Sequence, residues 1–380
     1  MPLDARETPI RIAFFLGILG GGGAERSTNR LAKELVARGY HVDLVASSVC
    51  GDMVDEVPAG VRLFDLKASG TARAVIPYIR YLRREDPEIV IACPSSVCFV
   101  AAAVNGTLTR RRMVIFVQRT WEGVLHGRQA RLRYRLQQIG VLAAYRRAEA
   151  IIAVSHATKQ HLLDIPGMKA ERIHVIYNPI WSPALEERAR EAVAHPWLAE
   201  PGGPPVVLAV SRLSREKGID ILLRAFALLL RQREARLLVL GEGEERPALE
   251  RLVAELGLAG RVSMPGFEPN PFAYMARCAL LVLPSRHEAL GNVLVEAMSV
   301  GTPVVSTASP GGTGEILGQG RFGVQVPVDD PPSMARAIEN TLDAPLDPGL
   351  LRARAREFSA ISSVIAVEKL IRECAARRQA

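Results

Sequence analysis

The stretch that decides how this chain is interpreted is Ser285-Arg286-His287-Glu288-Ala289-Leu290-Gly291-Asn292-Val293-Leu294-Val295-Glu296-Ala297-Met298. From Leu290 onward its apolar residues recur at the spacing of a helix. A strand-like apolar run, Ala279 to Leu283, comes before it, and a Pro284-Ser285 turn separates the two. The pattern therefore predicts a strand, a loop and a helix in that order.

The start of the predicted helix is suited to binding an anion. In the first turn of a helix the backbone N–H groups lack intrahelical partners, and the helix dipole favours negative charge there. In this chain the predicted donors are the N–H groups of Leu290, Gly291, Asn292 and Val293. Because Gly291 has no side chain, it lets an anion such as a phosphate come close to the backbone.

Two glutamates flank this predicted anion site. Glu288 precedes the helix and Glu296 lies about a turn and a half inside it, roughly 12 Å away if helical rise applies throughout. One carboxylate can bind the hydroxyls of a ribose and the other those of a hexose. Carboxylate pairs that hydrolyse glycosides stand closer together. The alternative is a surface helix with two solvated glutamates.

Cations and glycines follow other predicted strands in the same half of the chain. Arg212 and Lys217 lie between a strand and a helix, and the pair can neutralise a diphosphate, arginine as a bidentate fork and lysine as a point charge. The alternative for this segment is a solvated loop. Four more residues follow strand ends where a nucleotide can contact the backbone: Gly241, Gly243, Gly266 and Phe267.

Short apolar strands alternate with helices along most of the 380 residues, which is more chain than one core usually supports. The alternation predicts the α/β class with doubly wound parallel sheets. We expect an N-terminal domain over residues 1–180, a second domain over residues 181–359, and a C-terminal helix over residues 360–380 that packs back on the first domain. Pro183 to Pro205 is rich in proline, as a linker would be.

Composition excludes several classes of protein. The chain is 48% hydrophobic and 23% charged, it has no apolar run long enough to span a membrane, and its first residues lack a signal-peptide pattern, so we expect a cytoplasmic protein. Its five cysteines form no CxxC pair, which indicates reduced thiols and no metal site. No Ser-His-Asp, HExxH or Walker A pattern is present, so covalent or metal catalysis has no support in the sequence.

The positive charge of the chain is concentrated in its first half. Residues 1–180 contain 25 Lys and Arg against 16 Asp and Glu. Within this half, residues 128–147 predict a basic amphipathic helix, which can lie on the anionic inner face of a cell membrane. The alternative is an ordinary surface helix. Nucleic acid is not an expected partner, because aromatic residues make up only 5% of the chain and no binding module is recognisable.

A glycine quartet, Gly20 to Gly23, opens a helix after the first predicted strand, so its backbone can hold a phosphate or a sugar. The quartet is a poor dinucleotide fingerprint, because GxGxxG requires a glycine where Glu25 stands. A nicotinamide-dependent oxidoreductase that uses the quartet is nevertheless an alternative function.

Together, five segments of this sequence resemble the retaining glycosyltransferases of family 4. The segments are Gly21-Gly22-Gly23-Ala24-Glu25, Ser211-Arg212-Leu213 with Lys217-Gly218, Gly241-Glu242-Gly243, Pro284 to Met298, and Gly301-Thr302-Pro303-Val304-Val305. They occur in the order of that family and span nearly the whole chain. The resemblance implies the GT-B fold, in which two Rossmann-like domains face each other across a cleft.

The resemblance also implies an activity. The expected reaction moves a hexose-type sugar from a nucleoside-diphosphate donor, with UDP favoured, to a glycan or lipid-linked acceptor, as in cell-surface polysaccharide or glycolipid biosynthesis. The anomeric configuration is kept and neither metal nor cofactor takes part. By this similarity Glu296 holds the ribose, Glu288 holds the hexose, and Arg212 and Lys217 hold the diphosphate. The alternative is a non-catalytic sugar-nucleotide-binding protein on the same fold.

On the acceptor side the resemblance implies roles for Gly21, Gly22, Gly23 and Glu25. One departure from the family lies in the loop after the fourth N-terminal strand. Many members have a histidine there, whereas this chain has Arg119. Arg119 is therefore a candidate contact to acceptor or donor, and the role of the family histidine does not carry over.

Overall fold

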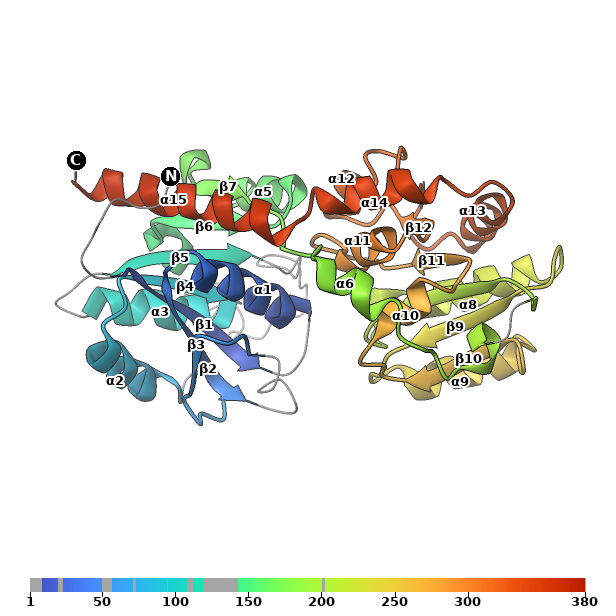
Figure 1. Cartoon of the computed structure of the whole chain (residues 1–380), viewed down its shortest axis with the longest axis horizontal. Helices are drawn as coiled ribbons and strands as arrows, with labels where there is room; N and C mark the ends of the chain where they lie inside the picture. Colours follow the sequence, from blue (N-terminus) through green and yellow to red (C-terminus); the bar gives the residue numbers. More distant parts are fainter. Residues whose placement is uncertain are drawn as a thin grey trace. The chain divides into compact units, whose positions relative to one another are not determined.

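A computed structural model of the chain describes residues 9–19, 23–49, 57–70, 73–93, 95–107, 112–118, 143–199 and 202–379. The chain divides into two compact units. Unit 1 combines Met1–Pro179 with Ala360–Ala380, and unit 2 is the continuous segment Ile180–Ser359. Each unit is an α/β structure built around one parallel sheet (Figure 1).

The described part of unit 1 contains a seven-stranded parallel sheet in the order β3-β2-β1-β4-β5-β6-β7. Its strands are β1 (Arg11–Leu19), β2 (His41–Val49), β3 (Val61–Asp65), β4 (Ile89–Cys93), β5 (Met113–Gln118), β6 (Ala150–Ala153) and β7 (Ile173–Val175). The strand order changes direction between β1 and β4, which makes this a doubly wound sheet with its switch point there.

Helices cover both faces of the unit 1 sheet (Figure 1). The described helices of this unit include α1 (Gly23–Ala37), α2 (Val75–Glu85), α3 (Ser95–Thr107), α5 (His156–Leu163), the short 3-10 helix η2 (Ala170–Arg172) and α15 (Ala360–Gln379). The last helix, α15, lies beside α1 and is held to the rest of unit 1 by an ion pair from Arg38 to Glu368 of 3.0 Å. The Ser363 hydroxyl also donates to the Tyr177 carbonyl at 2.8 Å.

The described part of unit 2 contains a six-stranded parallel sheet in the order β10-β9-β8-β11-β12-β13. Its strands are β8 (Val206–Val210), β9 (Arg236–Leu240), β10 (Val262–Gly266), β11 (Leu280–Leu283), β12 (Val304–Thr307) and β13 (Val324–Val326). In chain order this is the same winding as in unit 1, with the switch point between β8 and β11. The predicted fold class, doubly wound α/β, is therefore confirmed in both units.

Helices surround the second sheet as well. They are α6 (Pro183–Arg188), α7 (Pro196–Ala199), η3 (Arg215–Lys217), α8 (Ile219–Leu229), α9 (Arg246–Glu255), α10 (Pro271–Met275), α11 (Asn292–Ser299), α12 (Thr313–Ile316), α13 (Pro331–Asp343) and α14 (Pro348–Arg356). The segment interpreted as a linker instead forms α6 and α7 and is part of unit 2. Its backbone accepts hydrogen bonds from Asn270 and Arg277, which hold it in place.

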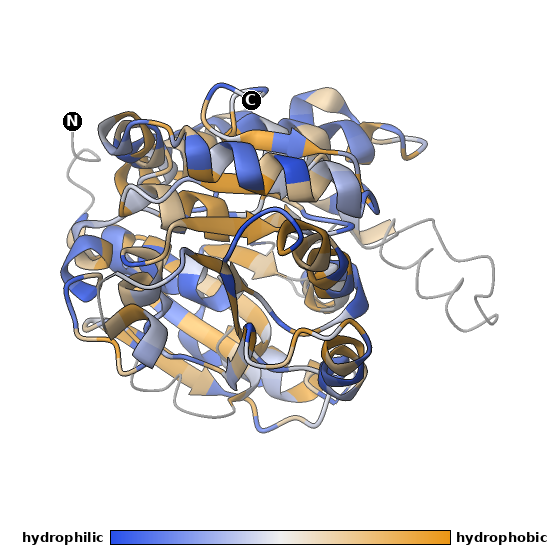
Figure 2. Ribbon diagram, turned by 90° about the vertical axis from the view of Figure 1, so that its right-hand side faces the viewer, coloured by the Kyte–Doolittle hydropathy of each residue, from blue (hydrophilic) through white to orange (hydrophobic). Residues whose placement is uncertain are grey.

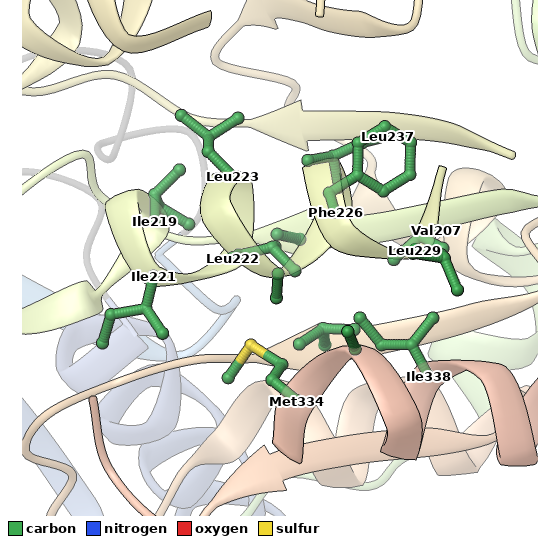
Figure 3. Packing of buried hydrophobic residues seen from close by; sticks show 14 of the residues in the cluster. Val207, Ile219, Ile221, Leu222, Leu223, Phe226, Leu229, Leu237, Met334 and Ile338 are labelled. Atoms are coloured by element: carbon green, nitrogen blue, oxygen red, sulfur yellow. The ribbon is translucent and has the colours of Figure 1, made fainter. Parts of the chain in front are cut away.

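Apolar side chains explain why α8 and α13 lie together on one face of this sheet. Figure 3 shows Ile221 and Leu222 of α8 near Met334 of α13, and all three are almost fully buried. In Figure 2 the strands are coloured mostly as hydrophobic, whereas the helices combine hydrophobic and hydrophilic residues. Burial of these strands on both faces is typical of parallel sheets and accounts for their continuous apolar sequences.

Part of the predicted basic helix lies outside the described residues. Residues 143–147 are helical, and residues 128–142 lie outside the described part of the chain. One arginine of the basic first half of the chain is not on the surface: Arg112 is 5% exposed and donates to the Leu82 carbonyl and to Asp86, each at 2.8 Å. Among the described helices, none is both long enough and apolar enough to cross a bilayer.

Candidate functional site

The predicted donor-site residues gather at one edge of unit 2. Arg212 and Lys217 lie between β8 and α8, and Glu288 lies between β11 and α11. The strands β8 and β11 are hydrogen-bonded neighbours, although β9 and β10 come between them in sequence. Because both are parallel, both loops leave from their carboxyl ends, at the switch point where ligands of doubly wound sheets bind.

The structure joins two residues that the sequence predicts separately. Lys217 Nζ lies 2.7 Å from Glu288 Oε1, and the Ser285 hydroxyl donates to the same oxygen at 2.9 Å. The Lys217 and Glu288 side chains are 24% and 13% exposed, so the pair is partly shielded from water. Among the described residues, no donor reaches the other carboxylate oxygen of Glu288, Oε2. A cation and an oriented carboxylate therefore share this edge of the sheet.

Arg212 is the more exposed cation. Its side chain is 65% exposed, and Nη2 lies 2.6 Å from Glu216 Oε1. Burial acts to raise the pKa of Glu216, but hydrogen bonds from its own backbone amide and from Arg212 outweigh burial, and the pKa lies below its ordinary value. Glu216 is therefore a stable anionic partner that orients the Arg212 guanidinium.

The helix that carries Glu296 begins two residues later than predicted. α11 starts at Asn292 rather than Leu290, because Gly291 has a φ of 92°, a left-handed conformation that cannot continue a helix. Leu290 is 2% exposed and belongs to the core. The prediction that Leu290 and Gly291 belong to the first helical turn is therefore wrong. Gly291 instead caps α11, and Asn292 and Val293 are the first two residues of the helix.

Glu296 lies on α11, as the sequence predicts, and is half-buried. Among the described residues, no hydrogen-bond or ion-pair partner reaches its carboxylate. Its backbone carbonyl accepts from the Ser299 hydroxyl at 2.6 Å.

Three of the predicted glycines have a structural reason that is independent of any ligand. A Cβ atom on Gly241 would lie 1.9 Å from the Ser211 carbonyl oxygen, and one on Gly243 would lie 2.2 Å from that of Leu213. The carbonyl of Gly266, at φ 110°, accepts the N–H of Gly241 at 2.7 Å. The loop after β9 therefore packs directly against the loops after β8 and β10. Phe267, the next residue, is 62% exposed at this edge.

Two further glycines join the loops that hold the ion pair, and sequence reasoning assigned neither of them a role at the site. A Cβ on Gly218 would lie 2.1 Å from the Pro284 carbonyl oxygen, which brings the Lys217 loop against the Glu288 loop. A Cβ on Gly311 would lie 1.4 Å from the carbonyl oxygen of Glu288 itself. Gly218 directly follows Lys217, and Gly311 lies in the loop after β12, but their contacts with the Glu288 loop are visible only in three dimensions.

The predicted acceptor-side residues belong to unit 1. Gly23 is the first residue of α1 and is exposed, and Glu25 lies in the first turn of that helix. Gly21, Gly22 and Arg119 lie outside the described residues, so their predicted roles stay predictions. Among the described strands, the one that precedes Arg119 in sequence is β5, the fifth in chain order rather than the fourth.

Other candidate chemistry is not found in the described residues. In the part of the chain that the structure describes, no three His, Cys, Asp or Glu residues come together as a metal-ligand group. The described cysteines are free thiols, namely Cys93, Cys98, Cys278 and Cys374. Burial raises the pKa of the Cys278 thiol well above its usual range, so Cys278 stays protonated.

Both halves of the chain match known protein families. Residues 193–359 match the family described as "Glycosyl transferases group 1", and residues 21–180 match "Glycosyltransferase Family 4". The two matches together span most of the chain: the family 4 match ends at residue 180, at the boundary between the units, and the other match begins at residue 193, inside unit 2. The chain belongs to the family 4 glycosyltransferases. The segment around Lys217 and Glu288 of this glycosyltransferase falls within the first of these matches.

Two curated relatives illustrate the range of the family. The chain is 29% identical to the lipopolysaccharide core biosynthesis glycosyltransferase LpsE of Rhizobium meliloti over 84% of this chain and 85% of that protein. It is 31% identical to N-acetylgalactosamine-N,N'-diacetylbacillosaminyl-diphospho-undecaprenol 4-alpha-N-acetylgalactosaminyltransferase of Campylobacter jejuni. That second match spans 52% of this chain and about half the length, 52%, of the relative.

Solved structures confirm that the fold of this glycosyltransferase is GT-B. Sucrose-phosphate synthase from Thermosynechococcus elongatus superposes with a TM-score of 0.81 at 22% identity, over 97% of this chain and 100% of the other. Anabaena HepE in complex with UDP-glucose superposes with a TM-score of 0.78 at 23% identity, over 96% and 100% of the two chains. At these identities the likeness concerns the fold alone.

Proposed function

We propose that this chain is a retaining glycosyltransferase that moves a hexose from a UDP-sugar to a glycan or lipid-linked acceptor. The observation that carries the proposal is the Lys217 ammonium 2.7 Å from the Glu288 carboxylate at the switch point of unit 2. A nucleotide sugar offers this edge an anionic diphosphate and a set of hydroxyl donors. A cation and a carboxylate held side by side suit both parts of that ligand.

Each charged group has a distinct role in the proposal. An ammonium has three donors, so Lys217 can hold Glu288 and a phosphate oxygen at the same time. Arg212 adds a second cation for the diphosphate. The Oε2 atom of Glu288 accepts a hexose hydroxyl, and the Glu296 carboxylate accepts the ribose hydroxyls. The amide groups at the start of α11 add donors for the phosphate.

The proposed reaction needs no protein nucleophile. The acceptor oxygen attacks the anomeric carbon on the face that the diphosphate leaves, so one C–O bond forms as another breaks and the configuration is kept. The proton of the acceptor hydroxyl passes to an oxygen of the leaving phosphate. Arg212 and Lys217 stabilise the negative charge that develops on this leaving group, which is electrostatic catalysis.

The names of relatives support the donor and acceptor classes. The Campylobacter jejuni relative is named for transfer to a diphospho-undecaprenol-linked sugar, and the Rhizobium meliloti relative for lipopolysaccharide core biosynthesis. The Anabaena neighbour of similar fold was solved with UDP-glucose bound. A UDP-hexose and a lipid-linked or polysaccharide acceptor are therefore the donor and acceptor we propose.

A cytoplasmic location with contact to the membrane surface completes the proposal. Arg80, Arg83 and Arg84 are exposed on α2 of unit 1, and Ile76 on the same helix is 62% exposed. Exposed arginines beside an apolar side chain suit an anionic bilayer surface. Flotation with anionic vesicles at low salt, compared with neutral vesicles, tests this part; equal flotation with both contradicts it.

Substitution of the ion pair tests the catalytic assignment. We expect Lys217→Ala and Glu288→Ala each to lower sugar transfer by about a hundredfold or more, because each removes charge at the reacting groups. Matched controls are Arg261→Ala and Glu234→Ala, which remove an exposed ion pair of 3.2 Å elsewhere in unit 2. Full transfer by either ion-pair variant, with a normal melting curve, rejects the assignment.

Two product measurements separate the alternatives. An NMR spectrum of the glycoside product reports the anomeric configuration, and an inverted product rejects the retaining mechanism. Binding of UDP without transfer to any acceptor or to water favours the non-catalytic sugar-nucleotide-binding protein instead.

Metal independence is a further part of the proposal, because Arg212 and Lys217 already supply two positive charges to the diphosphate. We expect transfer to continue at its full rate in excess EDTA after dialysis. A loss of transfer that added Mg²⁺ or Mn²⁺ restores would contradict this.

A further inference from the structure

One arginine in the stretch from Ser285 to Met298 connects the two loops of the site. Arg286 precedes Glu288 by two residues, and its backbone N–H donates to the Glu216 carbonyl at 2.7 Å. Its Nη1 atom donates to the Arg215 carbonyl, also at 2.7 Å. Glu216 is the neighbour of Lys217 in sequence. The Glu288 loop is therefore hydrogen-bonded to the Lys217 loop immediately beside the ion pair.

The same guanidinium reaches two carboxylates on other elements. Nη1 and Nη2 donate to Asp220 in the first turn of α8, at 2.9 and 2.8 Å, in a bidentate arrangement. Nε donates to Asp329 at 2.8 Å. Asp329 lies between β13 and α13 and has a φ of 57°, which is uncommon for a residue other than glycine. Arg286 therefore connects the loop after β11 with the loops after β8 and β13.

We propose that Arg286 is a positioning residue that sets the relative placement of Lys217 and Glu288 for sugar transfer. This inference rests on the proposed function, because it assigns Arg286 a role in that same site. The side chain is 20% exposed and is occupied by three partners of unit 2, so it acts through the two loops rather than by contact with substrate.

Charge and geometry contribute separately to this role. Without Arg286, the carboxylates of Asp220 and Asp329 would lose their shared counter-ion close to the site for an anionic diphosphate. Lysine at this position keeps the charge but cannot form the planar fork to Asp220 and Asp329. Arg286→Lys therefore tests geometry, and Arg286→Ala tests geometry and charge together.

The chain offers a matched control for loss of stability alone. Arg233, four residues after the end of α8, pairs with Asp343 at the end of α13 at 2.7 Å. Arg286 connects the opposite ends of the same two helices. Arg233→Ala therefore removes an arginine that joins α8 with α13 but lies away from the Lys217 and Glu288 loops.

The experiment compares wild type, Arg286→Ala, Arg286→Lys and Arg233→Ala. Calorimetry uses whichever of UDP, GDP and ADP binds wild type most tightly, and initial rates use the corresponding sugar nucleotide. We expect every variant to bind nucleotide at a stoichiometry near one. Arg286→Ala should weaken nucleotide binding by about tenfold and lower kcat by about a hundredfold, since small displacements of reacting groups have effects of this size. Arg286→Lys should recover much of the binding but less of kcat.

The outcomes distinguish this inference from the proposed function. The inference is overturned if Arg286→Ala has the same Kd and kcat as Arg233→Ala, or if its only change is a lower binding stoichiometry because part of the protein is unfolded. Arg286 is then merely structural, and the proposed function stands. If wild type binds none of the three nucleotides and transfers no sugar, the proposed function is overturned and the inference with it.

Discussion

At the scale of single residues, the site depends on backbone contacts that leave no space for a Cβ atom. The position of Gly241 and Gly243 after a predicted strand end predicts both as nucleotide contacts, yet packing against the loop after β8 already accounts for glycine at both positions. Gly218 and Gly311, which sequence reasoning did not assign to the site, also leave no space for a Cβ atom beside the Glu288 loop. Placement of the Glu288 carboxylate therefore depends on residues that carry no chemistry of their own.

Gly311→Ala should damage transfer more than it damages the fold. Gly311 has a φ of 131°, and its added Cβ would lie 1.4 Å from the Glu288 carbonyl oxygen, so the Glu288 backbone must move. We expect a loss of about 1–3 kcal/mol in stability and a fall of about a hundredfold in kcat. Urea denaturation and initial-rate kinetics measure the two effects.

Gly320→Ala is the matched control for Gly311→Ala. Gly320 also has a positive φ, 98°, but no atom lies within 4 Å of the position of its Cβ. The control carries the backbone strain without the clash, so it should lose stability and keep kcat. Equal kcat values for the two variants would show that Gly311 does not position Glu288.

At the scale of elements, local patterns predict much of the sheets and helices but not their contacts. Apolar runs locate β8 and β11, and the helical period locates α8 and α11. The three-residue strand β13 escapes such patterns, because its pairing with β12 rather than its own sequence defines Val324–Val326. The partners of Arg286, Asp220 and Asp329, lie 66 and 43 residues away in sequence. Long-range pairing of this kind leaves no periodic signal.

The stability of unit 2 should be sensitive to acid through His195, which lies between α6 and α7. The Trp197 N–H donates to His195 Nδ1 at 3.3 Å, and His195 Nε2 lies 3.1 Å from the Ser263 hydroxyl. Burial, and next the charge of Arg236, lower the pKa of His195 below its ordinary 6.5. The folded state therefore binds a proton at His195 less readily than the unfolded state does. Neutral His195 contributes stability that is fully present above pH 6.5 and is lost as the pH falls below that value.

Thermal unfolding between about pH 7.5 and pH 5 measures this effect, since the ordinary pKa of histidine lies inside that range. Protonation turns Nδ1 from an acceptor into a donor, which removes a hydrogen bond worth about 1 kcal/mol, or about 2–4 °C in Tm for a unit of this size. His195→Gln cannot titrate, so its Tm should fall less over the same range. Parallel profiles for the two proteins would exclude His195 as the source.

The last helix, α15, should contribute strongly to the stability of unit 1. Leu370 is 2% exposed on α15, so Leu370→Ala should cost about 2–5 kcal/mol of unfolding free energy. Ile365 on the same helix is 52% exposed, and Ile365→Ala should change stability by about 0.5 kcal/mol or less. Similar losses for the two variants, measured by denaturant unfolding, would mean that the buried face of α15 does not stabilise unit 1.

At the scale of the whole molecule, the chain builds the same winding twice but from differently connected segments. Unit 2 is one continuous segment, whereas unit 1 is completed by α15 only after unit 2 has been synthesised. The alternation of strands and helices in the sequence predicts a division of this kind, with boundaries near residues 180 and 359. Every described residue proposed to bind the donor, from Arg212 to Glu296, lies in the continuous segment.

Expression of residues 180–359 alone tests this arrangement. The buried core of unit 2, centred on α8, α13 and the sheet, is formed entirely within this segment, so we expect a single cooperative unfolding transition. Because Arg212, Lys217, Glu288 and Glu296 are all included, the fragment should bind the nucleotide diphosphate within about tenfold of the Kd of the full chain and transfer no sugar. Calorimetry on the fragment and on its Glu296→Ala variant measures this. If the folded fragment does not bind nucleotide, the donor site requires residues of unit 1, because every described group assigned to the nucleotide is already present in the fragment. If the fragment binds nucleotide equally well without the Glu296 carboxylate, the donor site does not use Glu296.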